Sequence, residues 1–514
     1  MDFINSNILT IVTFTPALGA LLLLFFPRSR AKTARNFALI ISILAFLFSL
    51  HLVAHFDSNA SGFQYRTDRA WIPSFGIGYQ LGIDGISLFL VLLTTLLTPL
   101  AILASTRIRD RVKEYFLFML LLETGVVGVF CSLDLFLFYV FWEVMLVPMY
   151  FLIGVWGGER RIYAAMKFVL YTMAGSVLML VAIIALYFLN GKATGAYTFS
   201  YELILAAIHG GKLVLEPATE RFLFLAFFVA FAIKVPLFPF HTWLPDAHVE
   251  APTAGSVLLA GVLLKMGTYG MLRFSLPLFP NMSHLFAPFI TLLAVVGIIY
   301  GALVAMVQPD MKKLVAYSSV SHMGFIVLGI FSFTPQGVEG AIFQMLSHGV
   351  STGALFLLVG VIYERRHTRL IEEFGGLAHR MPLYAAFFLI VTLSSIGLPG
   401  MNGFVGEFLV LLGTFGVNKP RGVVAAAGVI LSAVYMLWMF QRVIWGEITN
   451  EKNRTLTDLV SYEKAMLIPL LFLIFWMGIY SNHFLRPMDA SVARLLSQTG
   501  KREIQYAVAP ALQP

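Results

Sequence analysis

The sequence predicts an all-α polytopic membrane protein. Of its 514 residues, 59% are hydrophobic and only 12% are charged, and the mean hydropathy is +0.84. A soluble protein of this length could not bury so much apolar surface, so the balance is typical of an integral membrane protein. Apolar runs of about 20 residues, the length that crosses a bilayer as a helix, recur along the chain with mostly short connections.

These runs predict about 14 transmembrane helices. They lie at roughly 4–26, 36–55, 84–105, 114–132, 134–156, 163–190, 221–244, 254–275, 285–307, 314–332, 338–362, 383–413, 422–445 and 464–484. The longer connections are 56–83, 191–220, 364–382 and 446–463. None of these connections is long enough to hold a soluble domain.

Basic residues gather on one side of the predicted bundle. The connections at 28–35, 107–113, 160–161, 312–313, 365–380 and 452–454 carry most of them. By the positive-inside rule this side is cytoplasmic, so both termini are expected on the outer side. The tail, with Arg486, Arg494, Lys501 and Arg502, runs mildly against the rule, but a tail after the last span has little influence on topology. The net charge of +8 is therefore a topology signal and does not indicate nucleic-acid binding.

Several kinds of site are excluded by composition and motif. The one cysteine, Cys131, rules out an intramolecular disulfide, a Cys-ligated iron–sulfur cluster and a Cys-rich zinc site. The glycines at 397, 400, 403 and 406 do not follow a strand, so they are no dinucleotide fingerprint, and no phosphate-loop pattern occurs. His241 and His248 lack a third convergent ligand for a metal. We expect no cofactor and no metal bound by this chain.

Ionisable residues lie at the centres of the apolar runs. A lysine at membrane depth costs about 3 kcal/mol even on the most lenient scale, so such residues need a functional or structural reason. The residues at this depth are Glu143, Lys234, Lys265, His322 and His348, with Glu407 displaced towards the outer side. We interpret Glu143, Lys234, Lys265 and Glu407 as proton-transfer residues. His241, His248, His322 and His348 form the expected auxiliary polar path, His241 and His248 at its entrance with Asp246 and Glu250.

Two spans are interrupted at matching places. One breaks at the KVPLFP stretch after Lys234, and the other breaks at 396–403, just before Glu407. If spans four to eight and nine to thirteen are two copies of one five-helix unit, both broken helices are the fourth of their copy. Matched interruptions of this kind are typical of inverted-repeat transporters. The predicted division is 1–110 (three N-terminal helices), 111–276 and 277–446 (the inverted repeats), and 447–514 (last helix and tail).

Structural alternatives to proton transfer stay open. Glu143 and Lys234 are either a pair that exchanges a proton or a static buried ion pair that locks two helices. Gln344, Ser347, His348, Ser351 and Thr352 fall at helical spacing, where they either hold a file of waters or form interhelical hydrogen bonds. An inert membrane strut with unused charges is the corresponding alternative for the whole chain.

Five motifs resemble the antiporter-like subunits of bacterial respiratory complex I, the proton-pumping NADH–quinone oxidoreductase. They are LGIDGISLFLVLL (81–93), SLDLFLFYVFWEVMLVPMYFLIGVWG (132–157), KVPLFPFHTWLPDAHVEAPTAGSVLLAGVLLKMGTYG (234–270), MKKLVAYSSVSHMGF (311–325) and GLPGMNGFVGEF (397–408). The similarity covers nearly the whole chain. Within the family, a glutamate at the Glu407 position and a chain that stops soon after the last span resemble the subunit M branch.

The resemblance implies a route and a set of partners. Protons are expected to enter from the cytoplasm to Lys234, beside Glu143, and to pass through Lys265 to Glu407, which delivers them outward. NADH, FMN, iron–sulfur clusters and quinone would belong to other subunits. The implied partners are other membrane subunits of the complex, notably two sister antiporter-like subunits on either side, with phospholipids and protons. The implied location is the bacterial inner (plasma) membrane, with periplasmic termini. The alternative is a subunit of a multisubunit Na+/H+ antiporter or of a membrane-bound hydrogenase.

Overall fold

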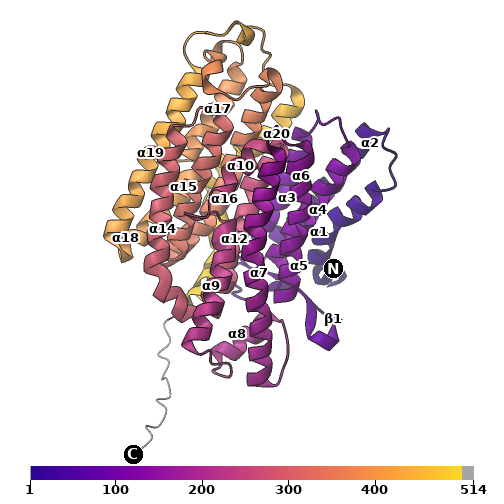
Figure 1. Cartoon of the computed structure of the whole chain (residues 1–514), viewed down its shortest axis with the longest axis vertical. Helices are drawn as coiled ribbons and strands as arrows, with labels where there is room; N and C mark the ends of the chain where they lie inside the picture. The colour runs from indigo at the N-terminus through magenta and orange to yellow at the C-terminus, as the bar shows by residue number, and fades with distance from the viewer. Residues whose placement is uncertain (1, 501–514) are drawn as a thin grey trace, which may run out of the picture.

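The computed structural model describes residues 2–500, which form an upright bundle of helices (Figure 1). The helices are α1 (Asp2–Leu23), α2 (Ala31–Ala54), α3 (Leu88–Ala104), α4 (Val112–Cys131), α5 (Leu135–Val144), α6 (Leu146–Trp156), α7 (Arg161–Thr194), α8 (Tyr201–His209), α9 (Pro217–Lys234), α10 (Trp243–Glu250), α11 (Thr253–Leu258), α12 (Leu264–Gly270), α13 (Leu276–Leu278), α14 (Pro280–Met306), α15 (Met311–Ile330), α16 (Pro335–Arg366), α17 (Pro382–Ser395), α18 (Asn402–Val417), α19 (Lys419–Ile444), α20 (Ser461–Ile479) and α21 (Asn482–Gln498). Two π-helical segments, η2 (Leu259–Leu263) and η3 (Met271–Ser275), flank α12.

Short elements complete the described chain. Strands β1 (Gln64–Ile72) and β2 (Ile77–Ile83) form an antiparallel hairpin. Single 3-10 turns occur at η1 (Pro73–Phe75), η4 (Ile371–Glu373), η5 (Leu377–His379) and η6 (Glu451–Asn453). The hairpin lies within the long connection 56–83 and was not predicted from the sequence.

The helical membrane class is confirmed. Within residues 2–500, eleven helical stretches are long and apolar enough to cross a membrane, and each corresponds to one predicted span. The other three predicted spans contain α3, which is 17 residues long, and the two interrupted pairs α9/α10 and α17/α18. The total of 14 spans and the inverted repeats stay predictions. The expected boundaries at 110, 276 and 446 fall before α4, within α13 and after α19.

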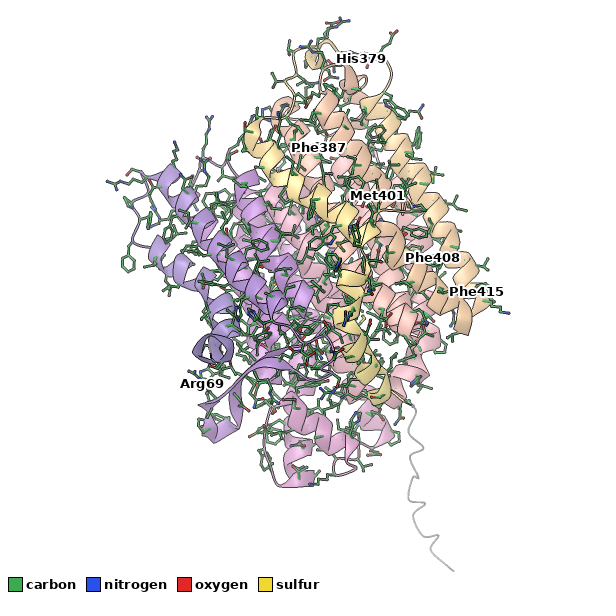
Figure 2. All side chains as sticks on the ribbon, turned by 180° about the vertical axis from the view of Figure 1, so that it is seen from behind. Arg69, His379, Phe387, Met401, Phe408 and Phe415 are labelled. Atoms are coloured by element: carbon green, nitrogen blue, oxygen red, sulfur yellow. The ribbon has the colours of Figure 1, made fainter. Side chains whose placement is uncertain are left out.

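Two spans form the centre of the bundle. The most apolar windows of 253–278 and of α16 are completely buried, whereas only 28% of that of α2 is buried. Close approach of α16 to α18 depends on small residues, because a Cβ added at Gly340 would lie 2.7 Å from Val410 N. Small residues let membrane helices pack backbone to backbone. The outward face of α18 carries Phe408 and Phe415, which are 49% and 46% exposed (Figure 2) and suited to lipid contact.

The two ends of the bundle carry different structures. At one end the basic connections contact each other: Arg28 pairs with Glu114, Arg107 with Glu364, and Arg369 with Asp310. This confirms that these connections share one side. The hairpin and the amphipathic helix α21 lie at the other end. There Arg69 donates a hydrogen bond to Asn7 Oδ1, and Arg494 donates one to the Ser61 carbonyl. Both ends of the described chain therefore lie on one side of the bundle; Lys501 and Arg502 lie outside the described residues.

Part of the predicted tail forms helix α21, which packs onto the bundle. Met488, Val492 and Leu495 are buried, and Ser491 Oγ accepts a hydrogen bond from Gly85 N at 2.9 Å. A short break at Tyr480 and Ser481 separates α20 from α21.

A buried ion pair anchors the same end of the bundle. Arg273, in η3, donates to Asp84 Oδ1 at 2.5 Å, and the two side chains are 7% and 6% exposed. Its guanidinium also lies 4.8 Å from the Phe63 ring, and its Nε donates to the Tyr269 hydroxyl at 3.2 Å. Asp84 in turn accepts the backbone N–H of Ile86 at 3.1 Å. The pair therefore joins the start of α3 to the end of the central span.

Replacing Arg273 with methionine is expected to destabilise the protein by about 3–5 kcal/mol, because the Asp84 carboxylate is then buried without its cation. Thermal denaturation in detergent should show a clearly lower midpoint. The double variant Asp84→Asn/Arg273→Met keeps the acceptor for Ile86 and removes both charges, so it should recover most of the loss. A double variant as unstable as the single one would contradict this account of the pair.

Candidate functional site

Lys234 ends α9 in a fully buried position. Its side chain is 0% exposed, and Nζ lies 3.5 Å from Met145 Sδ and over the rings of Trp142 and Phe168 at 5.6 and 5.2 Å. Among the described residues, no carboxylate lies within ion-pair distance of this ammonium. Aromatic faces and a thioether are weak partners for a cation. The lysine is held near the break without being locked in an ion pair.

Glu143 lies near Lys234 without contacting it. The carboxylate is close enough to act on the lysine electrostatically, and the Tyr139 hydroxyl is its hydrogen-bond partner. Helix α5 ends at Val144, one residue after Glu143, because Pro148 supplies no N–H to the Val144 carbonyl. The static ion pair is therefore not present in this structure. Glu143 is half-buried and lies in the last turn of α5, just before the break at Met145.

The chain unwinds between α9 and α10, over residues 235–242. Pro236 and Pro239 each lack a backbone donor, and both are preceded by cis peptide bonds. The Ile233 carbonyl, freed by the break, accepts the indole N–H of Trp243 at 2.8 Å. The predicted interruption beside Lys234 is confirmed.

The expected entrance residues lie on this segment and on α10. His241 is 3% exposed and packs edge-on against Tyr300, with ring centroids 5.1 Å apart. Asp246 pairs with Lys167 of α7 at 2.7 Å. Glu250 Oε2 accepts the backbone N–H of Arg160 at 2.9 Å. The two carboxylates are held by different partners, and neither contacts His241 in the described structure.

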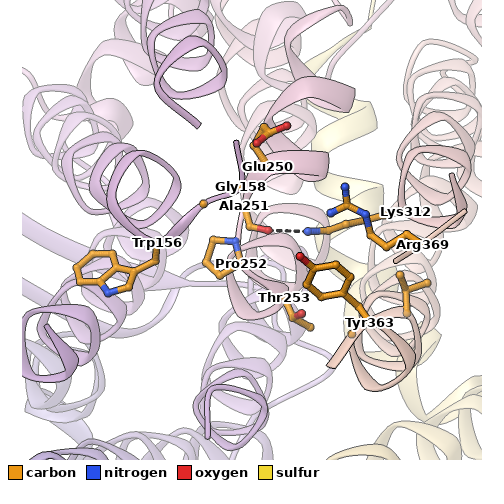
Figure 3. Close-up of a pocket in the computed structure, with 12 residues that line it drawn as sticks. Trp156, Gly158, Glu250, Ala251, Pro252, Thr253, Lys312, Tyr363 and Arg369 are labelled. Atoms are coloured by element: carbon orange, nitrogen blue, oxygen red, sulfur yellow. Dashed lines mark hydrogen bonds between the residues drawn. The ribbon is translucent and has the colours of Figure 1, made fainter. Parts of the chain in front are cut away.

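A hollow of about 130 Å³ opens beside Glu250 at the basic end (Figure 3). Lys312 Nζ donates to the Ala251 carbonyl at 2.5 Å, and Arg369 donates to the Val249 carbonyl at 2.9 Å. These carbonyls lie at the end of α10, where cations are favourable. The two basic side chains therefore fix the end of the helix that carries His248.

Lys265 forms the central contact of the site. Its Nζ donates to the Ala260 carbonyl and lies 2.6 Å from His348 Nδ1. Ala260 belongs to the π-helical segment η2, whose altered register leaves this carbonyl available; such segments are frequent at functional sites. His248 is also completely buried and stacks on Phe356, with ring centroids 4.6 Å apart. Its position gives it an electrostatic interaction with Lys265.

Glycines permit the contact between Lys265 and His348. A Cβ added at Gly349 would lie 2.8 Å from the Gly261 carbonyl, so η2 and α16 approach backbone to backbone here. Larger residues at these two positions would separate the helices. The sequence shows both glycines but not that they face each other.

Glu407, on α18, contacts the next buried histidine, His322. His322 Nδ1 lies 2.7 Å from Glu407 Oε1, and Gln344 Nε2 donates to the same oxygen at 3.0 Å. The rings of His322 and His348 are 5.7 Å apart between centroids. A Cβ at Gly406 would lie 2.5 Å from Gln344 Oε1, so glycine is needed for this packing. Lys265, His348, His322 and Glu407 thus form one row of neighbouring polar groups.

A second polar cluster lies in the break before α18. Asn402 Oδ1 accepts from Ser394 at 2.5 Å, and its amide donates to Ser351 Oγ at 3.2 Å. Gly397 and Gly400 have φ of +76° and +89°, a backbone conformation that favours glycine. The predicted interruption is confirmed, and part of the polar stripe on α16 does form interhelical hydrogen bonds.

Several buried polar atoms in this row, and on residues close to it or to Lys234, have no hydrogen-bond partner among the described residues. They are Glu143 Oε1, both ring nitrogens of His248, His348 Nε2, Gln344 Oε1 and Glu407 Oε2. Most buried polar atoms in proteins are hydrogen-bonded to protein or ordered water. The row therefore has free capacity to bind water or to accept a proton.

Two family models match the chain and together cover most of it. One, described as NADH:quinone oxidoreductase/Mrp antiporter, TM, matches residues 132–434. The other, NADH-ubiquinone oxidoreductase chain 4, amino terminus, matches residues 9–125. The NADH-quinone oxidoreductase subunit M of Rhodobacter capsulatus is 50% identical over 495 residues, which are 95% of this chain and 96% of the relative. The chain belongs to the NADH-quinone oxidoreductase subunit M family.

Other members and one solved structure agree with this assignment to the subunit M family. The NADH-ubiquinone oxidoreductase chain 4 of Chondrus crispus is 48% identical over 492 residues, covering 95% of this chain and 98% of the relative. A chain of respiratory complex I from Thermus thermophilus with bound NADH has a TM-score of 0.87 and 34% identity, covering 96% of this chain and all of that one. The resemblance inferred from the five motifs is confirmed.

The sequence analysis of this subunit M family member did not single out several buried charged residues, among them Glu123, Lys312 and Arg273. Glu123 is 1% exposed in α4, and neither of its carboxylate oxygens has a hydrogen-bond partner in the described chain. It lies near the middle of a predicted span, so the depth criterion that identified Glu143 applied equally to it. Lys312 and Arg273 lie near the ends of predicted spans. A charge there has a low insertion free energy, so its position in the sequence does not indicate a functional role. Their burial depends on α10 and α3, which are distant in sequence.

Proposed function

We propose that this chain is the proton-translocating membrane-arm subunit M of a NADH-quinone oxidoreductase (complex I). NADH oxidation and quinone reduction in other subunits would drive proton transfer through its buried Lys, Glu and His residues. The observation that carries this proposal is the series of neighbouring titratable residues Lys265, His348, His322 and Glu407 in the interior of the bundle. The relatives of the chain are NADH-quinone oxidoreductase M subunits.

The proton path has two parts in this proposal. Lys234 receives protons from the basic side, by way of His241 and His248, and Glu143 sets the proton affinity of the lysine by moving towards or away from it. The weak partners that surround Lys234 support this movement, because no ion pair holds the ammonium in place. From Lys265 the proton passes along the histidines to Glu407 and leaves on the opposite side.

The energies of the proposed step are sufficient. A neighbouring charge changes proton affinity by about 1–3 pH units, and each unit corresponds to about 1.4 kcal/mol. Moving one proton against roughly 100 mV takes about 2.3 kcal/mol. Making or breaking the interaction between Glu143 and Lys234 can therefore drive one proton against an ordinary membrane potential.

The same proposal places the chain in its surroundings. The basic side faces the cytoplasm, the protein lies in the bacterial inner membrane, and both termini are periplasmic. Two sister antiporter-like subunits flank it, and FMN, iron–sulfur clusters and quinone belong to other subunits. The two five-helix repeats at 111–276 and 277–446 are related by inversion, each with its own broken helix.

A cation/proton antiporter subunit is the competing function, since the matching family model includes Mrp antiporters. Inverted membrane vesicles from a strain lacking the chain distinguish the two. Complementation should restore NADH-driven proton uptake, with equal rates in sodium and potassium buffers. Sodium efflux that depends on the chain, without NADH-driven proton uptake, would contradict the proposal.

A further inference from the structure

Two neighbouring hollows lie at the basic end, around the connection between α3 and α4. Their volumes are about 490 and 680 Å³, and they share Arg109, Arg111, Val155 and Trp156. The first also reaches Arg28 in the α1–α2 connection. The start of α2 and the end of α6 lie at the same, upper end of the bundle in Figure 1. These hollows are separate from the row of buried residues between Lys234 and Glu407.

The hollows are strongly basic. Six basic residues line them, against two acidic ones, Asp110 and Glu114. The basic residues are Arg28, Arg107, Arg109, Arg111, Lys113 and Arg161. Arg28 and Arg107 have carboxylate partners, and Lys113 donates to the Leu24 carbonyl. In the part of the chain that the structure describes, Arg109, Arg111 and Arg161 have no ion-pair partner.

Apolar walls join these arginines to the membrane surface. Phe118 and Phe151 stack with ring centroids 4.8 Å apart, and Phe151 is 37% exposed. Trp156 closes the end of α6 and donates its indole N–H to the Asp110 carbonyl at 2.8 Å. Tryptophan is typical of the headgroup level of a membrane. The site thus has cations at the water boundary and aromatic rings directly below them.

We propose that these hollows bind the headgroup of an anionic phospholipid. Its phosphate contacts Arg109 and Arg111, and its acyl chains lie along Phe118 and Phe151. Basic pockets between membrane helices recognise anionic headgroups in this way. A free phosphate would use only the cations, whereas a lipid uses the cations and the apolar walls together. This site is independent of proton transfer and adds a lipid class to the membrane partners.

The test uses a photoreactive residue inside the site. The variant Phe151→p-benzoylphenylalanine, in the full chain within its assembled complex, is reconstituted into nanodiscs of equal phosphatidylglycerol and phosphatidylcholine. Illumination and peptide mass spectrometry then give the ratio of the two lipid adducts. We expect phosphatidylglycerol adducts to outnumber phosphatidylcholine adducts by on the order of tenfold, since each basic residue near the surface contributes measurably to anionic lipid binding. A probe at Phe472, 62% exposed on α20, should give the bulk ratio.

Matched variants separate the site from general surface charge. Adding Arg109→Gln/Arg111→Gln should reduce the enrichment to the bulk ratio, and Arg109→Lys/Arg111→Lys should keep most of it. The control Arg380→Gln/Lys452→Gln removes two exposed cations outside the hollows and should change nothing. Inorganic phosphate should compete no better than chloride at equal ionic strength. Enrichment that survives the glutamine pair, falls equally in the control pair, or is lost to free phosphate would overturn the proposal, as would cross-linking to a neighbouring polypeptide in place of lipid.

Discussion

Replacing Glu143 with glutamine is expected to reduce NADH-driven proton pumping by about tenfold or more, whereas aspartate should retain most of it. Glutamine has nearly the same shape and removes the charge that acts on Lys234. Losing a neighbouring charge shifts a proton equilibrium by at least about one unit, which is a factor of ten. Aspartate keeps the charge on a side chain one methylene shorter. The measurement is the initial rate of proton uptake by inverted vesicles.

Two controls make this comparison decisive. The amount of chain in the membrane and NADH oxidation with an artificial electron acceptor should be the same in all variants, because both report assembly and not pumping. If the glutamine and aspartate variants pump equally well, Glu143 has a packing role only. Glu143→Ala with normal pumping in an intact complex would support an inert strut.

Replacing Lys234 with arginine should lower pumping about as strongly as replacing it with methionine. Arginine keeps the positive charge but does not release its proton in this pH range, and methionine carries none. The cation at this position lies against Trp142, Phe168 and Met145. A structural role for the charge alone would be satisfied by arginine, so the two variants separate titration from simple charge.

The matched control is Lys167→Arg on α7. Lys167 is partly exposed and pairs with Asp246 at 2.7 Å, and arginine forms such pairs equally well. Pumping by this variant should stay within about twofold of the wild type, since exposed ion pairs contribute little. Normal pumping by Lys234→Arg would rule out deprotonation of Lys234 as a step.

The local chemistry of the sequence predicted the breaks but not the contacts across them. Prolines after Lys234 and glycines before Glu407 act within a few residues, so both interruptions could be located. The contact of His322 with Glu407 joins residues 85 positions apart, and it depends on how α15 and α18 pack. The distance between Glu143 and Lys234 depends likewise on packing, so the sequence could not show whether the two side chains are in contact.

Irregular helices and peripheral elements were harder to predict for a different reason. A π-helical segment such as η2 changes which carbonyl is free by one residue, and composition carries no sign of that register. Helix α21 is amphipathic and not continuously apolar, so a search for apolar runs passes over it. Asn402 lay inside a recognised break, but its hydrogen bonds to Ser351 and Ser394 come from two other helices.

A high-resolution density map of the assembled complex tests the central claim most directly. If protons move along the buried row, ordered waters should connect the unpartnered atoms of Glu143, His248, His348 and Glu407 and join Lys234 to Lys265. The account predicts a continuous hydrogen-bonded thread at these residues. Dry, tightly packed surroundings at the same positions, with no water between Lys234 and Glu407, would contradict it.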